Sequence, residues 1–280
     1  MLRKSIVCQL AASTLLASSS VSAGIEPSSV SVQYGDNFEN QNQVFLDLEL
    51  SINDIGYLNL GVGSSDYALT SQTTLTTDYY SIGYSSPSGT DVSFGLNYDY
   101  WELHGLYADS YTARLNFYTG NWSIGLHPEL HYITFSPINR RELNYRNAGG
   151  GISIGYISDN KTYLYAEYYS YYFSTNQPPL RNQISLSSQL ERALRLIQEQ
   201  VASSFDDQRT TIGADYYFDT ANIGVEYQQA TAVIDASEYK TITLTSSLSF
   251  SNAWHTGVSV SHTHGSDDEF YTFNLGYDWE

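Results

Sequence analysis

The chain has 280 residues, of which 30 are acidic and 12 are basic, and its formal net charge is −18 at pH 7. So large a negative charge argues against nucleic acid as a partner, because the phosphate backbone carries charge of the same sign. The single cysteine, Cys8, provides no disulfide framework, so the fold must depend on hydrogen bonding and packing. No apolar run approaches the roughly 18 residues that a transmembrane helix needs.

The first 23 residues have the order of a secretory signal peptide. Two basic residues precede an apolar run over residues 6–16, and small residues predominate at positions 18–23. A charged start, a short apolar run and small residues before the cleavage point are the three parts of such a peptide. We therefore expect a signal peptide over residues 1–23 and one exported domain over residues 24–280.

Apolar side chains alternate with polar or small ones along most of the remaining chain. Successive side chains of a β-strand point to opposite faces, so each alternating segment predicts a strand with one apolar face. In the first half of the chain the expected apolar faces are Val30, Val32 and Tyr34; Val44, Leu46, Leu48 and Leu50; Leu58, Leu60 and Val62; Tyr80, Ile82 and Tyr84; Val92, Phe94, Leu96, Tyr98 and Tyr100; Tyr111, Ala113, Leu115 and Phe117; and Trp122, Ile124, Leu126, Pro128 and Leu130.

The alternation continues in the second half of the chain. There the expected apolar faces are Ile152, Ile154 and Tyr156; Ile212, Ala214, Tyr216 and Phe218; Ile223, Val225 and Tyr227; Ile242, Leu244, Leu248 and Phe250; Trp254, Thr256, Val258 and Val260; and Tyr271, Phe273, Leu275, Tyr277 and Trp279. Residues 161–173 are rich in tyrosine on both parities, so they predict a strand without showing which face is which.

The connections between these segments fall into two classes that alternate along the chain. Tight turns are expected near Asn53, Ser88, Gly120, Asp159, Thr220 and Asn252. Mostly longer loops are expected near Gly35, Ser65, His104, Asn139, Pro178, Ala236 and Gly265. This alternation indicates an antiparallel meander with turns at one end and loops at the other, which a soluble β-sandwich has no reason to keep.

The last segment, residues 269–279, is about 10 residues long, the length that a tilted strand needs to cross a bilayer. It resembles the closing strand of a Gram-negative outer-membrane β-barrel, although Trp279 is penultimate where that class usually ends on an aromatic residue. The resemblance implies an all-β, transmembrane, antiparallel up-and-down barrel of about 14 strands, with 12 or 16 as alternatives. It also implies a porin-like protein of the cell outer membrane, in contact with membrane lipid and lipopolysaccharide and inserted by the barrel-assembly machinery.

An insertion over residues 174–207 breaks the strand pattern. Within residues 184–205, apolar side chains recur at helical spacing, at Leu186, Leu190, Ala193 or Leu194, Ile197 and Val201. The spacing predicts an amphipathic helix of about five turns in a long extracellular loop. Because an apolar stripe must be buried against something, we expect the helix to constrict or cover the barrel mouth, to bind a partner, or to rest on neighbouring loops.

The polar faces of the strands would line the lumen, and nine charged or titratable residues fall on them: Asp47, Glu49, Asp99, Arg114, His127, Glu129, His131, Asp215 and Glu226. We predict that these residues line a water-filled pore, because a barrel of about 14 strands leaves room for water. The alternative is that the charges pair across the lumen and brace the wall. Small residues on the same faces would leave further space, namely Gly95, Gly213, Gly224, Gly257 and Gly276.

Neither metal chemistry nor catalysis is expected. The run from His127 to His131 places three polar side chains on one strand face at steps of about 6.8 Å, too far apart for one zinc ion with bonds of about 2 Å. No spacing singles out a nucleophile with its base and acid, which leaves a barrel lipase or protease as a minor alternative. The sequence predicts a non-enzymatic, cofactor-free diffusion channel for small hydrophilic solutes, biased towards cations. A non-conducting barrel for adhesion or surface recognition is the main alternative.

Overall fold

The computed structural model of the protein describes residues 25–37, 41–53, 55–70, 73–87, 91–103, 106–135, 143–173, 206–232, 238–251, 253–264 and 269–279. The expected signal peptide and the expected helix over residues 184–205 lie outside these ranges, so both stay predictions from the sequence. Among the described residues, no helix is long and apolar enough to cross a membrane.

Within these ranges the chain forms fourteen β-strands, and each strand pairs with the next one along the chain. The strands are β1 (Ile25–Asp36), β2 (Gln41–Ile52), β3 (Gly56–Thr70), β4 (Thr73–Ser85), β5 (Val92–Leu103), β6 (Leu106–Thr119), β7 (Trp122–Phe135), β8 (Leu143–Ile157), β9 (Thr162–Phe173), β10 (Asp206–Tyr217), β11 (Ala221–Ala232), β12 (Glu238–Ser249), β13 (Trp254–His264) and β14 (Glu269–Asp278).

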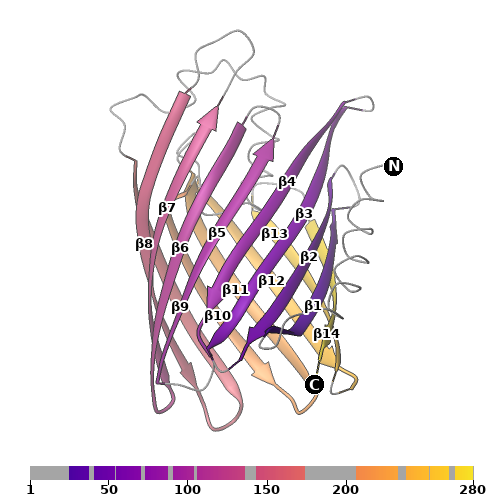
Figure 1. Ribbon diagram of the computed structural model, residues 1–280, viewed down its shortest axis with the longest axis vertical. Coiled ribbons are helices and arrows are strands. Elements are labelled where there is room, and N and C mark those ends of the chain that lie inside the picture. The colour runs from indigo at the N-terminus through magenta and orange to yellow at the C-terminus, as the bar shows by residue number, and fades with distance from the viewer. Residues whose placement is uncertain are drawn as a thin grey trace.

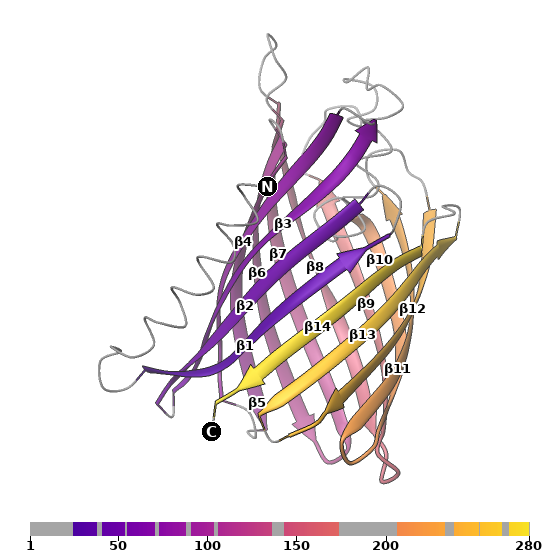
Figure 2. The ribbon, with the colours of Figure 1, turned by 90° about the vertical axis from the view of Figure 1, so that its right-hand side faces the viewer.

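The sheet closes between its first and last strands. β14 pairs antiparallel with β1, from Ser29 opposite Asp278 to Asp36 opposite Tyr271, and the two strands lie side by side in Figure 2. With every strand paired on both sides, the sheet leaves no open edge, and a bilayer offers no water to hydrogen-bond such an edge. The predicted all-β, antiparallel, up-and-down barrel and the predicted number of strands are confirmed.

The described tight turns lie at one end of the barrel, the lower end in Figure 1, where β14 also ends. Thr119 pairs with Trp122 across the β6–β7 turn, and Gly120 there has φ 56°, a conformation that glycine adopts without steric cost. Lys161, before β9, donates a hydrogen bond to Asp219, after β10, and its ammonium group lowers the pKa of the Asp219 carboxyl. We call this end the turn end and the opposite end the loop end.

The outer face of the barrel carries the apolar side chains that the alternation predicts. Leu96 is 57% exposed, Leu244 is 56% exposed and Ile152 is 59% exposed, although all three lie within long strands. Apolar side chains of this size are normally covered, and on a barrel that spans a membrane the covering material is lipid.

Paired aromatic rings lie at two levels of the outer face, in a belt at the turn end and in a partial belt on β4 to β7 towards the loop end. At the turn end, Trp122 packs on Tyr156 with ring centroids 4.8 Å apart, and Trp254 packs on Tyr277 at 4.9 Å. Towards the loop end, the centroid of the Tyr111 ring lies 5.1 Å from that of Tyr98 and 6.2 Å from that of Tyr132. Aromatic rings with polar tips favour the level of the lipid headgroups, so the two belts mark the two membrane surfaces.

Strand β9, whose orientation the sequence leaves open, turns one row of tyrosines outward and another inward. The outward row is exposed and includes Tyr168 and Tyr172. The inward row, on the opposite parity, consists of Tyr163, Tyr165, Tyr169 and Tyr171. Because both parities carry aromatic rings, hydrophobic alternation contains no information about the face, and only the pairing of β9 with β8 and β10 decides it.

Candidate functional site

The strand register places all nine residues predicted for the lumen on the face opposite to the exposed apolar one. Asp47 and Glu49 lie on β2, Asp99 on β5 and Arg114 on β6, and the remaining ones are His127, Glu129 and His131 on β7, Asp215 on β10 and Glu226 on β11. Hydrogen bonds between side chains of strands that are not neighbours show that this face is concave. Tyr165 on β9, for example, donates to Glu226 on β11 at 2.7 Å.

Part of this inner wall is a buried network centred on Glu129. Its Oε2 atom accepts a hydrogen bond from the Tyr171 hydroxyl at 2.7 Å and lies 3.2 Å from Nε2 of His131. The other ring nitrogen of His131, Nδ1, lies 2.7 Å from the Ser110 hydroxyl. The His131 side chain is fully buried and that of Glu129 is 6% exposed. We call Ser110, Glu129, His131 and Tyr171 the Glu129 network.

A second group of polar residues lies beside this network and was not predicted. Asp206 at the start of β10 accepts a hydrogen bond from the Tyr239 hydroxyl at 2.6 Å, and Nη1 of Arg209 lies 3.8 Å from it. The Arg209 guanidinium also lies over the ring of Tyr169, 4.3 Å from its centroid. A register shift between Asp206 and Gln208 breaks the alternation before Arg209, so sequence parity could not place Asp206, whereas Arg209 shares the inward parity of Gly213 and Asp215.

Inward tyrosines reach over small residues to carboxylates two strands away. Tyr171 on β9 is paired with Gly149 on β8, which is paired with Glu129 on β7, and the tyrosine donates to that carboxylate. Tyr165 on β9 reaches Glu226 on β11 in the same way. Gly213 on β10 lies between these two residues. In the same way, Tyr239 on β12 passes over Ala230 on β11 to reach Asp206 on β10.

These bridges correct the expectation that inward glycines leave open space. A Cβ atom at Gly213 would collide with the Tyr165 ring, and one at Gly276 would collide with the His255 ring. At Gly224 the obstacle is the Asp215 carboxylate. The glycines are small because a neighbouring side chain lies across them, and only Gly95 and Gly257 have surroundings no tighter than ordinary van der Waals contact.

The carboxylates of the inner wall differ in their partners. Asp99 accepts hydrogen bonds from Tyr79 at 2.5 Å and Asn97 at 2.7 Å. Glu129 and Asp206 lie in the groups described above, beside His131 and Arg209. Other wall carboxylates form no ion pair with a lysine or arginine among the residues that the structure describes, namely Asp47, Glu49, Glu167, Asp215 and Glu226. The two hypotheses from the sequence, charges that line a water-filled pore and charges that pair to brace the wall, therefore apply to different parts of the wall.

The order Ser110–His131–Glu129 resembles the hydroxyl, base and acid of a hydrolase, a grouping that the sequence did not single out. The Ser110 side chain is 6% exposed and His131 is completely buried, so an acyl group has no room beside the hydroxyl. The geometry fits a brace between β6 and β7 better than a reacting centre. Within the described part of the chain, no three His, Asp or Glu side chains are arranged to hold a metal ion.

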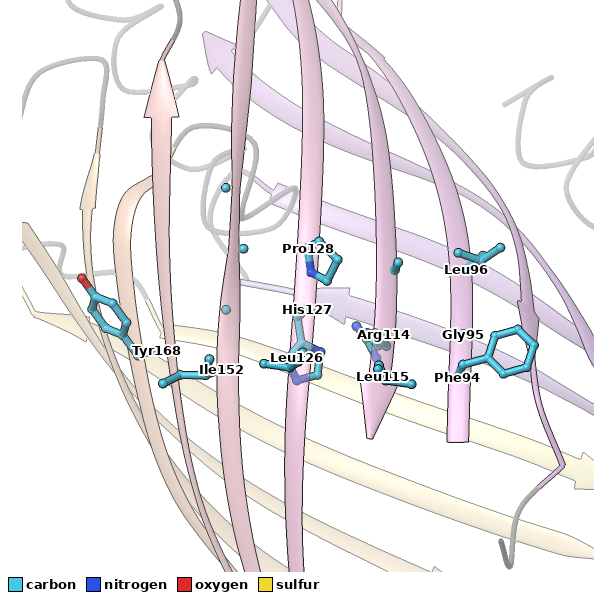
Figure 3. Close-up of a pocket in the computed structure, with 14 residues that line it drawn as sticks. Phe94, Gly95, Leu96, Arg114, Leu115, Leu126, His127, Pro128, Ile152 and Tyr168 are labelled. Carbon is cyan, nitrogen blue, oxygen red and sulfur yellow. The ribbon is translucent and has the colours of Figure 1, made fainter. Parts of the chain in front are cut away.

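The structure also has a hollow in the outer wall, of about 860 Å³, over β5 to β9 (Figure 3). One row of small residues crosses its floor, since Ala113, Pro128 and Gly150 face outward between the larger side chains of Leu115 and Ile152. Pro128 has no N–H group, and the ladder between β6 and β7 is interrupted there, while Pro128 remains paired with Gly150 on β8. Most of its lining is apolar and faces outward, and the inward residues Arg114 and His127 also border it.

Gly150→Ala is expected to destabilise the barrel by about 1–3 kcal/mol, because the new Cβ would lie 2.6 Å from the carbonyl oxygen of His127 and 2.9 Å from Cα of Pro128. Both obstacles are backbone atoms, which cannot turn away. The free energy of unfolding in lipid vesicles measures the effect. Gly95→Ala is the matched control, since its nearest neighbour would lie 3.4 Å away, and equal stability of the two variants would contradict the argument.

Comparison with known proteins agrees with the fold. No protein-family model matches the chain, and no curated protein matches its sequence. Solved barrels do match its structure. The chain shares the barrel fold of these solved structures. The CymD monoaromatic hydrocarbon channel is 10% identical, with 92% of this chain and 88% of that one covered and a TM-score of 0.50.

Two further solved structures match with lower scores. The toluene transporter TodX of P. putida is 10% identical, with 93% and 91% coverage and a TM-score of 0.49. The KdgM porin in complex with disordered oligogalacturonate is 12% identical, with 90% and 99% coverage and a TM-score of 0.45. At such identities the likeness concerns the barrel as a fold, and the solutes of these proteins do not carry over to this chain.

Proposed function

We propose that the protein is a passive diffusion channel of the Gram-negative outer membrane for small hydrophilic solutes, with a bias towards cations. The observation that carries this proposal is the inner wall, where Asp47, Glu49, Asp215 and Glu226 have no ion-pair partner among the described lysines and arginines. An ionised carboxylate that lacks a counter-charge needs water, so these side chains support a hydrated lumen.

The arrangement of these charges supports the cation bias. Asp47 and Glu49 lie on β2, whereas Asp215 and Glu226 lie on β10 and β11, so negative charge is presented from separate parts of the wall. Charged side chains along a pore attract ions of opposite sign and repel ions of like sign. In this proposal the signal peptide exports the chain, the barrel-assembly machinery inserts it, and lipid and lipopolysaccharide surround its apolar outer face.

The test is the conductance of the mature protein, refolded from residue 24 onward and added to a planar lipid bilayer. Discrete current steps and a zero-current potential of the sign given by cation preference are expected in a salt gradient. A folded, heat-modifiable barrel that gives no steps would overturn the channel proposal and leave surface recognition through the loops as the remaining function.

A hydrolase is the other activity to test, because Ser110, His131 and Glu129 are hydrogen-bonded in sequence. We expect a fluorophosphonate probe, which labels activated serines, to leave the folded barrel unmodified, since Ser110 is 6% exposed. Mass spectrometry of the intact protein measures the adduct. Labelling that disappears in Ser110→Ala would show instead that the serine is an accessible nucleophile.

A further inference from the structure

Towards the turn end of the inner wall, three neighbouring strands present tyrosines and carboxylates in two adjoining rows. In the first row Tyr163 on β9 is opposite Asp215 on β10. In the second row Tyr165 on β9 is opposite Gly213, which is opposite Glu226 on β11. The two carboxylates lie together on β10 and β11 beside the Tyr165 ring, while the Tyr163 ring lies on the other side of Tyr165, over Gly155 of β8. We call Tyr163, Tyr165, Asp215 and Glu226 the β9–β11 patch.

The tyrosine rings of this patch form a flat surface. The rings of Tyr163 and Tyr165 are stacked, with centroids 5.5 Å apart and an angle of 22° between their planes. One face of the Tyr165 ring covers Gly213, so its other face is directed to the lumen. Both side chains are part-exposed, in contrast to Tyr169 and Tyr171 further along the strand, which are 4% and 5% exposed. The patch therefore combines aromatic faces with access from the lumen.

The carboxylates of the patch lack a counter-charge. Asp215 and Glu226 are diagonal neighbours on adjacent strands, because Asp215 is paired with Gly224 and Gly213 is paired with Glu226. Each carboxylate lies close enough to repel the other's charge, and Glu226 has a neutral hydroxyl donor, Tyr165. Among the described residues, no lysine or arginine forms an ion pair with either of them.

Another inward tyrosine of β9, Tyr169, shows which kind of group binds on such a ring. Arg209 places its guanidinium over the ring of Tyr169, 4.3 Å from the centroid, and lies beside the Asp206 carboxylate. A cation over an aromatic face is attracted by the negative charge density of the ring, and a nearby carboxylate adds to the attraction. Towards the loop end the chain thus supplies its own cation to a tyrosine and a carboxylate, whereas in the patch it supplies none.

We propose that the β9–β11 patch binds organic cations that carry alkylammonium groups, as a station for such solutes within the lumen. The ammonium groups bind between Asp215 and Glu226, and the alkyl portion lies along the rings of Tyr163 and Tyr165. The inference rests on the proposed function, because the solute reaches the patch through the lumen. A neutral sugar would also stack on the rings, but it would leave both carboxylates without a counter-charge.

The experiment is isothermal titration calorimetry of the folded barrel in non-ionic detergent at low salt. Putrescine is the probe, because its two ammonium groups match two carboxylates, and 1,4-butanediol is its uncharged isostere. Putrescine is expected to bind and butanediol is not. Asp215→Asn combined with Glu226→Gln is expected to weaken putrescine binding at least tenfold. Tyr163→Leu is expected to weaken it by roughly threefold, the magnitude of a part-exposed cation–π contact.

A matched variant separates this site from the general charge of the lumen. Asp47→Asn combined with Glu49→Gln removes the same charge from β2, and putrescine binding is expected to stay within about twofold of the wild type. Equal weakening by both double variants, or no putrescine binding by the wild type, would overturn the proposal. Binding by a barrel that conducts no ions would overturn the channel function alone, and ion conductance without putrescine binding would overturn only the site.

Discussion

Neutralising four of the unpaired wall carboxylates should lower the cation-over-anion permeability ratio by roughly eightfold in 0.1 M salt. The variant has Asp47 and Asp215 changed to Asn, and Glu49 and Glu226 changed to Gln. Four unit charges at about 10 Å in water contribute roughly 1.7 kcal/mol, and screening over one Debye length leaves about a third of it. The screened energy stabilises a cation in the lumen and destabilises an anion by the same amount. The free-energy difference that sets the permeability ratio therefore changes by about twice that energy. The zero-current potential in a salt gradient measures the ratio.

The control for this prediction removes the same charge from the outer face. Asp66, Asp78, Glu102 and Asp109 lie on the outward parity of β3 to β6, and changing them to their amides leaves the inner wall intact. The permeability ratio of that variant should stay near the wild-type value. The difference between the two variants should also shrink in 1 M salt, where the Debye length falls to about 3 Å. If both variants shift the ratio equally, the wall carboxylates are not the source of selectivity.

Glu129→Ala is the substitution with the largest expected effect on stability, a loss of about 3 kcal/mol in the free energy of unfolding. The carboxylate accepts hydrogen bonds from Tyr171 and lies 3.2 Å from His131, and all three side chains are buried. Removing it leaves the hydroxyl and the ring nitrogen without an acceptor, and each such buried group costs roughly 1–3 kcal/mol. The urea midpoint of the barrel in lipid vesicles measures the loss.

Two variants show whether burial is the cause. Glu129→Gln keeps one acceptor oxygen, so its loss should be about 1 kcal/mol. Glu226→Ala removes a carboxylate that also accepts from a tyrosine, Tyr165 at 2.7 Å, but at a part-exposed position. Water can replace that acceptor, and the loss should be below about 1 kcal/mol. Equal losses at the two glutamates would contradict the buried network as the source of stability.

Much of the fold could be predicted because the membrane imposes a pattern that a sequence can show. Lipid on one side and polar groups on the other force side chains to alternate, and residues such as Leu96 and Leu244 keep that alternation along their strands. Turn residues such as Gly120 indicate where the strands end. From these features follow the fourteen strands, the closed antiparallel order and the inward face of the nine predicted residues.

Alternation fails where both faces carry the same kind of side chain or where the register shifts. Strand β9 has tyrosines on both parities, and the register shift beside Asp206 hides the inward position of that carboxylate. The Glu129 network was missed for another reason. Ser110 and Tyr171 come from strands on either side of Glu129, and nothing in the local sequence connects them.

The sequence by itself determined which side chains face lipid and which face inward, because strand periodicity is a local property of the chain. The tertiary structure alone decided which inward groups meet. Tyr165 reaches Glu226, and Tyr171 reaches Glu129, because closure of the barrel curves the wall and the glycine between each pair lets the ring pass. Pairing between strands fixes these neighbours, and it depends on the register of segments that are distant in the chain.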